Sequence, residues 1–392
     1  MTKPVLAYHL CLSDMNLVDL FDISAAGIFK HQRKTPRVDT ETLLYGYTPT
    51  PIFADDKVLS AKLFTGTYSP ALAARAFLRG LSEVRDVRVF TYDLGLQYPL
   101  RRPPNYLGAW SSFQWENVTR EVPWKTYHID SLGETPTTSR GSLKAIRETV
   151  AVLQHNIEAY GPDAEHIVTE CVPGGTTTAS ALLKALGKDS LPMVSSSSDL
   201  GVIQNKVEVA RKLVDGFERE ATTHGGAQYM ELMKFYLMDN FQLFMTEFLS
   251  DEEFFFSRSS RSPKIILGGG VQMLAPVGYV QRKYIDECRG GYVDFLKKRI
   301  SCLTTPWVTE SLLDSDLGRD YFLEETRTLY TKHITVFKAA SANWDIYNDP
   351  FRSPREGLGM GCLTHLAARV FSVSEMAQLL LDEEKSFEGR LC

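Results

Sequence analysis

The stretch HIVTECVPGGTTTASALLKALG, residues 166–187, decides the fold. It begins with a short apolar run, His166 to Cys171, which has the length and composition of a buried β-strand. A Gly-Gly-Thr-Thr-Thr turn at 174–178 follows, and helix-forming residues continue from Ala179 to Leu186, where Gly187 ends the pattern. A strand, a glycine turn and a helix in succession form the repeating unit of a parallel sheet with crossover helices.

Two later segments repeat this unit. Leu191 to Ser195 predicts a second strand, which is followed by a helix from Asn205 to Val214. Lys264 to Leu267 predicts a third strand, and three glycines separate it from a helix that starts at Gln272. Further elements are expected upstream: helices over 71–81 and 142–160 and a strand over 87–92. The sequence thus indicates an α/β fold with a parallel-sheet, Rossmann-like three-layer core.

The composition of the 392 residues narrows the class of protein. Apolar residues make up 44% and charged residues 23%, which is typical of a globular chain. The net charge of −5 leaves no surplus of Lys and Arg to neutralise a phosphate backbone, so we expect no nucleic-acid partner. The six cysteines form no C-x-x-C pair, which favours reduced thiols, a cytoplasmic protein and no metal site. The most apolar window, 235–249, is too short to span a membrane, so no membrane partner is expected.

We expect three parts along the chain. Residues 1–140 form an N-terminal part that includes segments of a small domain, 141–371 form the α/β core, and 372–392 form a C-terminal helix. The small domain is expected to be mainly helical and built from the chain ends. Residues 95–135, rich in Pro, Gly, Trp and Tyr, are expected to run over the surface, and 217–262 are expected to be a mostly helical insert.

Three loops follow the three predicted strands, and polar residues or glycines dominate each of them. Because open α/β sheets bind ligands at the carboxyl ends of their strands, we expect these loops to bind the phosphate and ribose of a nucleotide. An ordinary turn between a strand and a helix explains any one loop equally well, but three in succession favour a site. The residues concerned are Gly174, Gly175, Thr176, Thr177, Thr178, Ser195, Ser196, Ser197, Gly268, Gly269 and Gly270.

Three titratable residues are the catalytic candidates. Glu170 ends the strand before the first loop, and Lys206 opens the helix after the serine loop, although either could be a surface residue in an ion pair. Glu356 begins the sequence Glu-Gly-Leu-Gly-Met-Gly, where it could also be an acid favoured by the dipole of the following helix. The glycine turn formed by Gly357 and Gly359 indicates backbone pressed against a ligand or against the neighbouring strand ends.

Four motifs carry a family resemblance. They are ECVPGGTTTA at 170–179, VSSS at 194–197 followed by Lys206, LGGGVQMLA at 267–275 and EGLGMG at 356–361. In this order and spacing they resemble the nicotinate-nucleotide:dimethylbenzimidazole phosphoribosyltransferase family. The sequence ISAAG at 23–27 is similar to the archaeal and cyanobacterial branch of that family.

The resemblance implies a reaction of cobalamin biosynthesis. Family members displace nicotinate from nicotinate mononucleotide with a nitrogen of an aromatic base such as a benzimidazole, which gives an α-ribotide. It implies that Glu356 is the general base and that Glu170 and Lys206 lie near the ribose and the leaving nicotinate. It further implies small-molecule substrates, no cofactor beyond the donor nucleotide, no metal, and a homodimer.

The acceptor base and the turnover itself stay open at this point. Cys362 and the pair Phe21-Asp22 depart from the family pattern, and both could reach the acceptor side. The alternatives are the same donor cleft with another acceptor in a specialised pathway, hydrolysis of the nucleotide, and nucleotide binding without catalysis. Glu356 argues against the last, because binding alone needs no base. A dinucleotide oxidoreductase is excluded by the lack of G-x-G-x-x-G.

Overall fold

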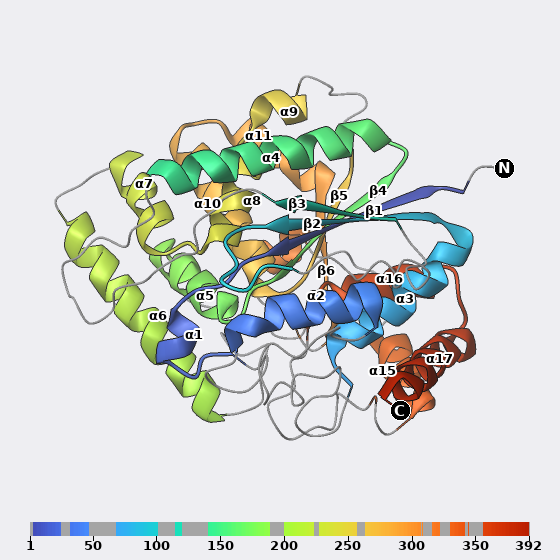
Figure 1. Cartoon of the computed structure of the whole chain (residues 1–392). Helices are drawn as coiled ribbons and strands as arrows, with labels where there is room; N and C mark the ends of the chain where they lie inside the picture. Colours follow the sequence, from blue (N-terminus) through green and yellow to red (C-terminus); the bar gives the residue numbers. More distant parts are fainter. Residues whose placement is uncertain are drawn as a thin grey trace.

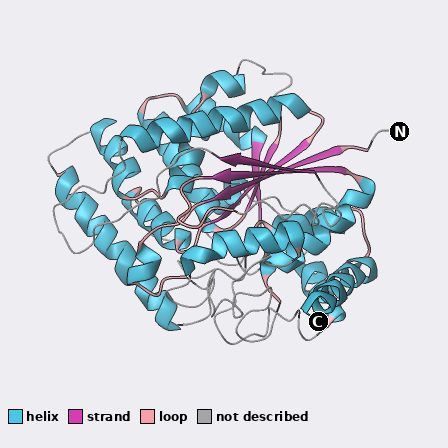
Figure 2. Cartoon of the chain, in the orientation of Figure 1, coloured by secondary structure: helices cyan, strands magenta, loops and turns pink. Residues whose placement is uncertain are grey.

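A computed structural model gives the fold, and a sheet of six parallel strands runs through its centre (Figures 1 and 2). The order across the sheet is β3-β2-β1-β4-β5-β6. The strands are β1 Val5–Leu12, β2 Asp86–Asp93, β3 Gln114–Thr119, β4 Glu165–Cys171, β5 Ile265–Gly268 and β6 Ile300–Leu303. The structure describes residues 3–24, 32–46, 68–100, 114–119, 140–188, 200–222, 227–256, 263–306, 308, 316–321, 330–341, 344 and 356–391. The predicted parallel α/β core is confirmed.

Both faces of the sheet are buried, as the side chains of β1 show. Leu6, Tyr8 and Leu10 point into the core on one face, and Ala7 and Cys11 into the core on the other. Side chains on a strand alternate between faces, so a strand that is apolar at nearly every position must lie between two layers of helices. The molecule therefore has the expected three layers.

Helices from the middle of the chain cover the face toward which Ala7 points (Figure 1). They are α4 Arg140–Tyr160, α5 Gly175–Ala185, α6 Leu200–Ala221, α7 Ala227–Tyr236, α8 Asn240–Leu249, α9 Glu252–Phe256, α10 Val271–Asp286 and α11 Gly290–Arg299. α8 packs between α4 and α10, and its Phe241, Phe244 and Phe248 are fully buried. The segment 217–262 is helical in its described parts, as expected, but it belongs to the core of this layer.

Helices from the two ends of the chain cover the opposite face (Figure 1). They are α2 Thr35–Tyr45, α3 Pro70–Val84, α15 Tyr330–Ala340, α16 Met360–Ala368 and α17 Val373–Leu391. The shorter elements are α1 Leu17–Leu20, η1 Gln32–Lys34 and α13 Asp316–Tyr321, and the buried side chains of α1 and α13 pack in the core on the other face. The buried Arg75 of α3 joins this layer, since it donates to Glu383 of α17 and to the carbonyls of Leu43 and Leu44 in α2. The mainly helical part built from the chain ends is therefore confirmed.

Several sequence expectations need correction or lie outside the described residues. The 95–135 segment contains β3, whose sequence QWENVT has too many polar residues to show an apolar strand pattern, because β3 is an edge strand. One sheet takes β1, β2 and β3 from before residue 140 and three strands from after it, so the boundary expected there divides a single sheet. The strand expected at 191–195 lies outside the described residues. None of the described helices is long and apolar enough to cross a membrane.

Candidate active site

The carboxyl ends of the parallel strands bring most of the predicted site residues to one edge of the sheet. Glu170 is the penultimate residue of β4, Gly268 ends β5, and Thr304 directly follows β6. The loop that begins at Glu356 packs onto the same edge, because its carboxylate accepts hydrogen bonds from the residues after β6. Residues separated by nearly 190 positions in the sequence therefore meet in one place.

Four donors surround the carboxylate of Glu356. Oε2 accepts from the hydroxyl of Thr304 at 2.9 Å and from the backbone N–H of Thr305 at 2.8 Å. Oε1 accepts from the backbone N–H groups of Gly357 and Gly361, each at 3.1 Å. The half-buried position raises the pKa of Glu356, and these hydrogen bonds oppose that effect. The orientation of the carboxylate is fixed, and every usual acceptor position on it is filled.

The glycines of the Glu-Gly-Leu-Gly-Met-Gly loop allow it to lie against the strand ends. A Cβ at Gly361 would be 2.3 Å from the backbone of Thr304 and Thr305, and one at Gly359 would be 2.8 Å from Oγ1 of Thr169. Gly359 has φ +62° and is the N-cap of α16, where a left-handed conformation favours glycine. Of the two explanations for these glycines, contact with neighbouring strands is the one that the structure supports. Gly357 is different, because a Cβ there would make only an ordinary contact with Pro70 at 3.5 Å.

The carboxyl group of Glu170 differs from that of Glu356 in how its two oxygens are hydrogen-bonded. Its Oε2 accepts from the N–H of Val172 at 2.8 Å and from Nε2 of Gln272 at 3.2 Å. No hydrogen bond to Oε1 is found among the described residues, and this oxygen would be 3.6 Å from a Cβ at Gly269. Burial and, to a smaller extent, the nearby carboxylates of Asp239 and Glu356 raise the pKa of Glu170 to about 8, against the lowering effect of the hydrogen bond from Val172. Glu170 is thus a buried carboxyl group that holds its proton at neutral pH.

The first turn of α5 contains the predicted phosphate cradle. Gly174 is its N-cap with φ +78°, and the backbone turns here from β4 into the helix. The hydroxyl of Thr176 accepts from Nζ of Lys206 at 3.0 Å, and Lys206 of α6 is 1% exposed, so that burial lowers its pKa to about 7. The structure therefore brings Lys206 to the predicted cradle, and its predicted place near the ribose and the leaving nicotinate stays a prediction. Phosphate binding by these residues stays a prediction.

The individual cradle residues differ in what the fold requires of them. The hydroxyl of Thr178 donates to Oδ2 of Asp239 at 2.7 Å, whereas Oγ1 of Thr177 is buried and has no hydrogen-bond partner in the described part of the chain. A Cβ at Gly174 would be 2.9 Å from Val18, and one at Gly175 would be 2.6 Å from Nε2 of Gln272. Packing alone thus explains both glycines. Thr178 is bound within the protein, and the backbone N–H groups of Gly175 and Thr177 donate to the carbonyls of Val172 and Gly174.

The remaining predicted residues have different outcomes. Gly268, Gly269 and Gly270 form the turn from β5 into α10, and the N–H of Gly269 donates to the carbonyl of Leu303. Ser195, Ser196 and Ser197 lie outside the described residues, so their predicted part in the site stays untested. Among the described residues, no group of three or more His, Cys, Asp and Glu side chains could hold a metal ion.

Sequence reasoning missed several residues that belong to this edge. Thr304 and Thr305 follow the short apolar run 300–303, and a polar pair directly after such a run is the signal that could have found them. Asp239 and Gln242 lie in the apolar window that was considered only as a membrane span, although Asp before a helical stretch is a typical N-cap. Their position beside α5 depends on packing and has no sequence signal.

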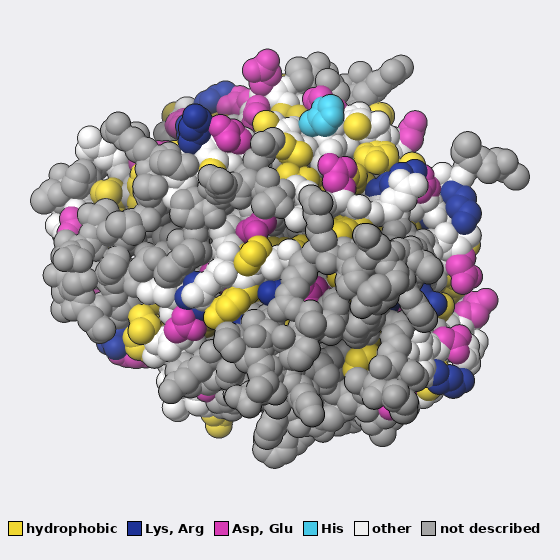
Figure 3. Space-filling model, viewed as in Figure 1, with side chains coloured by type: hydrophobic (Ala, Val, Ile, Leu, Met, Phe, Trp, Pro, Cys, Tyr) yellow, Lys and Arg dark blue, Asp and Glu magenta, His cyan; other side chains and the backbone are white. Residues whose placement is uncertain are grey.

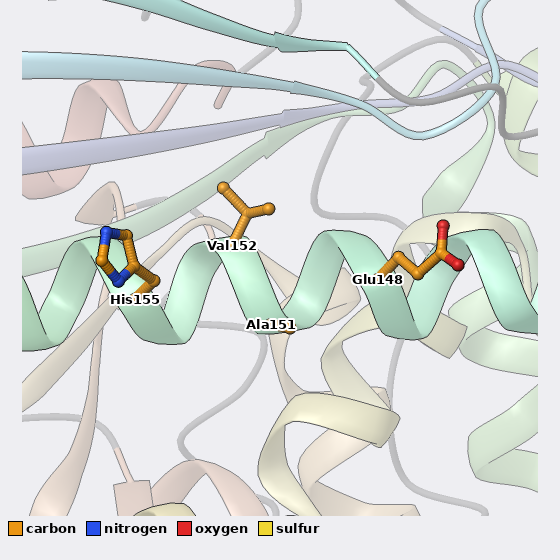
Figure 4. A pocket seen from close by; sticks show the side chains of 4 residues that line it. All are labelled: Glu148, Ala151, Val152 and His155. Atoms are coloured by element: carbon orange, nitrogen blue, oxygen red, sulfur yellow. The ribbon is translucent and has the colours of Figure 1, made fainter.

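A separate hollow of about 480 Å³ lies along α4 and does not include the predicted residues (Figure 4). Its described lining comes from a single helix, namely Glu148, Ala151, Val152 and His155. On the described part of the face in Figure 3, acidic and basic side chains lie among each other. Neither feature competes with the strand edge as the candidate site.

Comparison with known proteins agrees with this architecture. A crystal structure of a nicotinate-nucleotide-dimethylbenzimidazole phosphoribosyltransferase from Thermus thermophilus aligns with 97% of this chain and 83% of its own, with a TM-score of 0.50 and 13% identity. The resemblance to this family is confirmed. At that identity the likeness shows the fold, and the fold is the three-layer arrangement described above.

Proteins related in sequence have higher identities to this chain, but their names do not state an activity. A UPF0284 protein from Rippkaea orientalis is 26% identical over 352 residues, which is 86% of this chain and 81% of that protein. A UPF0284 protein from Thermoplasma acidophilum is 30% identical over 225 residues, which is 56% of this chain and 55% of that protein. No model of a known protein family matches this sequence.

Proposed function

We propose that this chain is a phosphoribosyltransferase that transfers the 5-phosphoribosyl group of nicotinate mononucleotide to a ring nitrogen of an aromatic base. The observation that carries the proposal is the pair Glu170 and Glu356. Burial raises the pKa of both carboxyl groups, and they lie at one edge of a parallel sheet, next to the helix N-terminus that begins at Gly175. The likeness in fold to a protein named as such an enzyme supports it.

The reaction breaks the bond from C1′ of the ribose to the pyridine nitrogen of nicotinate, and the bonding electrons leave with that nitrogen. The acceptor nitrogen forms the new bond to C1′ from the opposite face, which gives an α-ribotide. The acceptor N–H proton goes to a carboxylate, and we assign this role to Glu356. Since all four acceptor positions of Glu356 are filled, the proton must displace one donor, and the side chain of Thr304 is the one that can rotate away.

The other residues orient the donor and balance its charge. The dipole at the N-terminus of α5 suits an anionic phosphate, and the ammonium group of Lys206 lies at the same turn. Glu170 in its neutral form places no negative charge beside that phosphate, and its proton can be donated to a ribose or nicotinate oxygen. Holding both reactants in this geometry contributes much of the rate.

The test is the release of nicotinate from nicotinate mononucleotide by the purified protein, with a panel of aromatic bases and without base. We expect release that depends on a base, with dimethylbenzimidazole as the first candidate acceptor. Release without base indicates hydrolysis, and preference for another base indicates a specialised pathway. Donor binding by calorimetry without release indicates a nucleotide-binding protein in which Glu356 serves only the packing of its loop. Absence of binding contradicts the proposal.

The proposal extends to the state in which the enzyme works. We expect a homodimer in the cytoplasm that acts on small molecules without a cofactor other than the donor nucleotide. Light scattering gives the oligomeric state. Adding a chelator to the nicotinate-release reaction tests the independence from metal, because an unchanged rate is expected.

A further inference from the structure

The N-terminus of α8 lies directly against the first turn of α5. Asp239 is the N-cap of α8, and its Oδ1 accepts from the N–H of Gln242 at 2.8 Å. Its Oδ2 accepts from the hydroxyl of Thr178 at 2.7 Å. Nε2 of Gln242 donates to the same hydroxyl at 2.9 Å and to the carbonyl of Gly175 at 3.3 Å. Asp239, Gln242 and Thr178 are all fully buried, so water does not compete for these bonds.

The same end of α8 also holds a second loop of the strand edge. Asn240 donates from Nδ2 to the carbonyl of Leu94, just after β2, at 2.8 Å. Two turns at the carboxyl edge, one after β2 and one after β4, are therefore tied to a single helix end. This helix end comes from the 217–262 segment, which no sequence motif connects with the site.

Asp239 also acts on Glu170 through charge. The groups that face Glu170 are Asp239 from α8 and Glu356 from the loop before α16, together with Gln272 of α10 and the thiols of Cys11 in β1 and Cys171 in β4. Of the charged groups in this set, both carboxylates are negative and disfavour a further negative charge. Removing the charge of Asp239 while keeping its shape would make ionisation of Glu170 easier.

We propose that Asp239 is a positioning residue of the donor site, which fixes the first turn of α5 and places a negative charge near Glu170. The inference rests on the proposed function for the identity of the ligand. The two roles use different features of one side chain. The hydrogen bonds need two acceptor oxygens in this place, and the effect on Glu170 needs the negative charge.

Two substitutions separate these roles, and a third is a matched control. Asp239→Asn keeps an acceptor and a good N-cap but removes the charge, whereas Asp239→Ala removes both. Asp251 offers the control, because its Oδ1 caps α9 through the N–H of Phe254 at 3.0 Å and its Oδ2 accepts from Gln154. Asp251→Ala therefore removes an N-cap from the same segment without touching α5.

The measurement is the affinity for nicotinate mononucleotide from pH 6 to pH 9. In the wild type we expect affinity to fall as pH rises through about 8, because the ionised Glu170 repels an anionic ligand. Lys206 loses its positive charge near pH 7, and this loss should lower the affinity by the same amount in every variant. Asp239→Asn should move the Glu170 part of the curve to lower pH. Asp239→Ala should in addition raise Kd at pH 6 on the order of tenfold, as expected for a lost buried hydrogen bond.

If Asp239→Asn and Asp251→Ala both show the same affinity as the wild type at every pH, the inference is wrong and the proposed function stays intact. Failure of the wild type to bind the nucleotide overturns the proposed function instead. In that case ¹³C NMR of labelled glutamate carboxyl groups tests the inference without ligand, with the Glu170 signal assigned by its loss in Glu170→Gln. A Glu170 titration midpoint that does not fall in Asp239→Asn contradicts the inference.

Discussion

Glu170 and Glu356 lie at the same edge of the sheet, and their surroundings differ. Glu356 accepts four hydrogen bonds, three of them from backbone N–H groups, while Glu170 accepts two, both on one oxygen. Glu170 is 5% exposed and Glu356 is half-buried. Hydrogen bonds therefore orient the carboxylate of Glu356 and oppose the effect of burial on its pKa, whereas burial raises the pKa of Glu170 to about 8.

This difference suits the two carboxyl groups to different roles, Glu356 to that of a base and Glu170 to that of a neutral acid. A carboxylate that receives a proton must be ionised beforehand, and backbone donors favour the ionised form. A carboxyl group that stays neutral beside a phosphate must have a raised pKa, and burial among other acids provides it. Two titratable groups whose environments differ in this way are typical of active sites. Four substitutions test the comparison, and the one with the largest expected effect comes first.

Replacing the base should have the largest effect. Glu356→Gln removes the charge and places an NH₂ group where two N–H donors or Thr304 and Thr305 now point. We expect nicotinate release to fall on the order of 10²–10⁴-fold, as for the loss of an acid–base group. The rise of the wild-type rate with pH should disappear as well. Steady-state kinetics across pH measures both, with donor affinity as the control for folding of the site.

The Gln substitution also has a structural consequence that must be measured. Unpaired donors should lower the thermal midpoint of Glu356→Gln. If the rate loss is no larger than the loss of folded protein at the assay temperature, the packing role explains Glu356 and the base must be sought elsewhere, at Glu170 first.

A side chain placed between the Glu-Gly-Leu-Gly-Met-Gly loop and the residues after β6 should have the next largest effect. Gly361→Ala places a Cβ 2.3 Å from the backbone of Thr304 and Thr305, which no side-chain rotation relieves. We expect a loss of more than about 3 kcal/mol in the free energy of unfolding. Gly357→Ala is the matched control, because its Cβ meets only Pro70 at 3.5 Å. Denaturant unfolding of both variants should separate them, and equal stabilities would show that the loop does not lie where the structure places it.

Replacing the carboxyl group of Glu170 with an amide should stabilise the protein at pH 8 and weaken its activity. Its pKa is about 8 in the folded chain against an ordinary value of 4.5, so the unfolded chain ionises first as pH rises. The wild type should therefore lose stability between pH 4.5 and 8, on the order of a few kcal/mol. Glu170→Gln should lack this loss and be the more stable protein at pH 8. Thermal midpoints at pH 5 and pH 8 measure the difference.

The control for this substitution lies in the same strand. Glu165 at the start of β4 is partly exposed and pairs with Arg369, so Glu165→Gln should bring no gain at pH 8. If Glu170→Gln and Glu165→Gln follow the same pH dependence, Glu170 is not protonated in the folded protein, and the contrast between the two carboxylates is wrong.

Removing one donor from Glu356 should have the smallest effect. Thr304→Val keeps the size of the side chain and deletes the hydrogen bond at 2.9 Å. Because that bond lowers the pKa of Glu356, the pKa should rise, and the rising limb of the rate should move to higher pH. The rate on the plateau should stay within a few-fold of the wild type. A limb that does not move indicates that another group titrates in this pH range.

The sequence alone was enough for the repeating unit and for the order of its loops. The patterns at 166–187 and 264–272 predict strand, turn and helix because apolar period, glycine and cap residues are local properties. β4 and β5 were found because buried parallel strands are continuously apolar, but β1, which is equally central and apolar, was not predicted. β3 was missed because an edge strand is not, and β6 and its following threonines are too short a run to stand out.

Within the site, the sequence determined which residues could do chemistry, and the tertiary structure decided their state. Glu170, Lys206 and Glu356 were identifiable from their places beside glycine turns and strand ends. Among the described residues, Glu356 accepts from four donors and Glu170 accepts on one oxygen only. These patterns depend on contacts with Thr304, Thr305 and Gln272, which come from other strands and helices. Asp239 joined the site only through the packing of α8 on α5, because burial and charge–charge distance are properties of the folded chain and not of any local pattern.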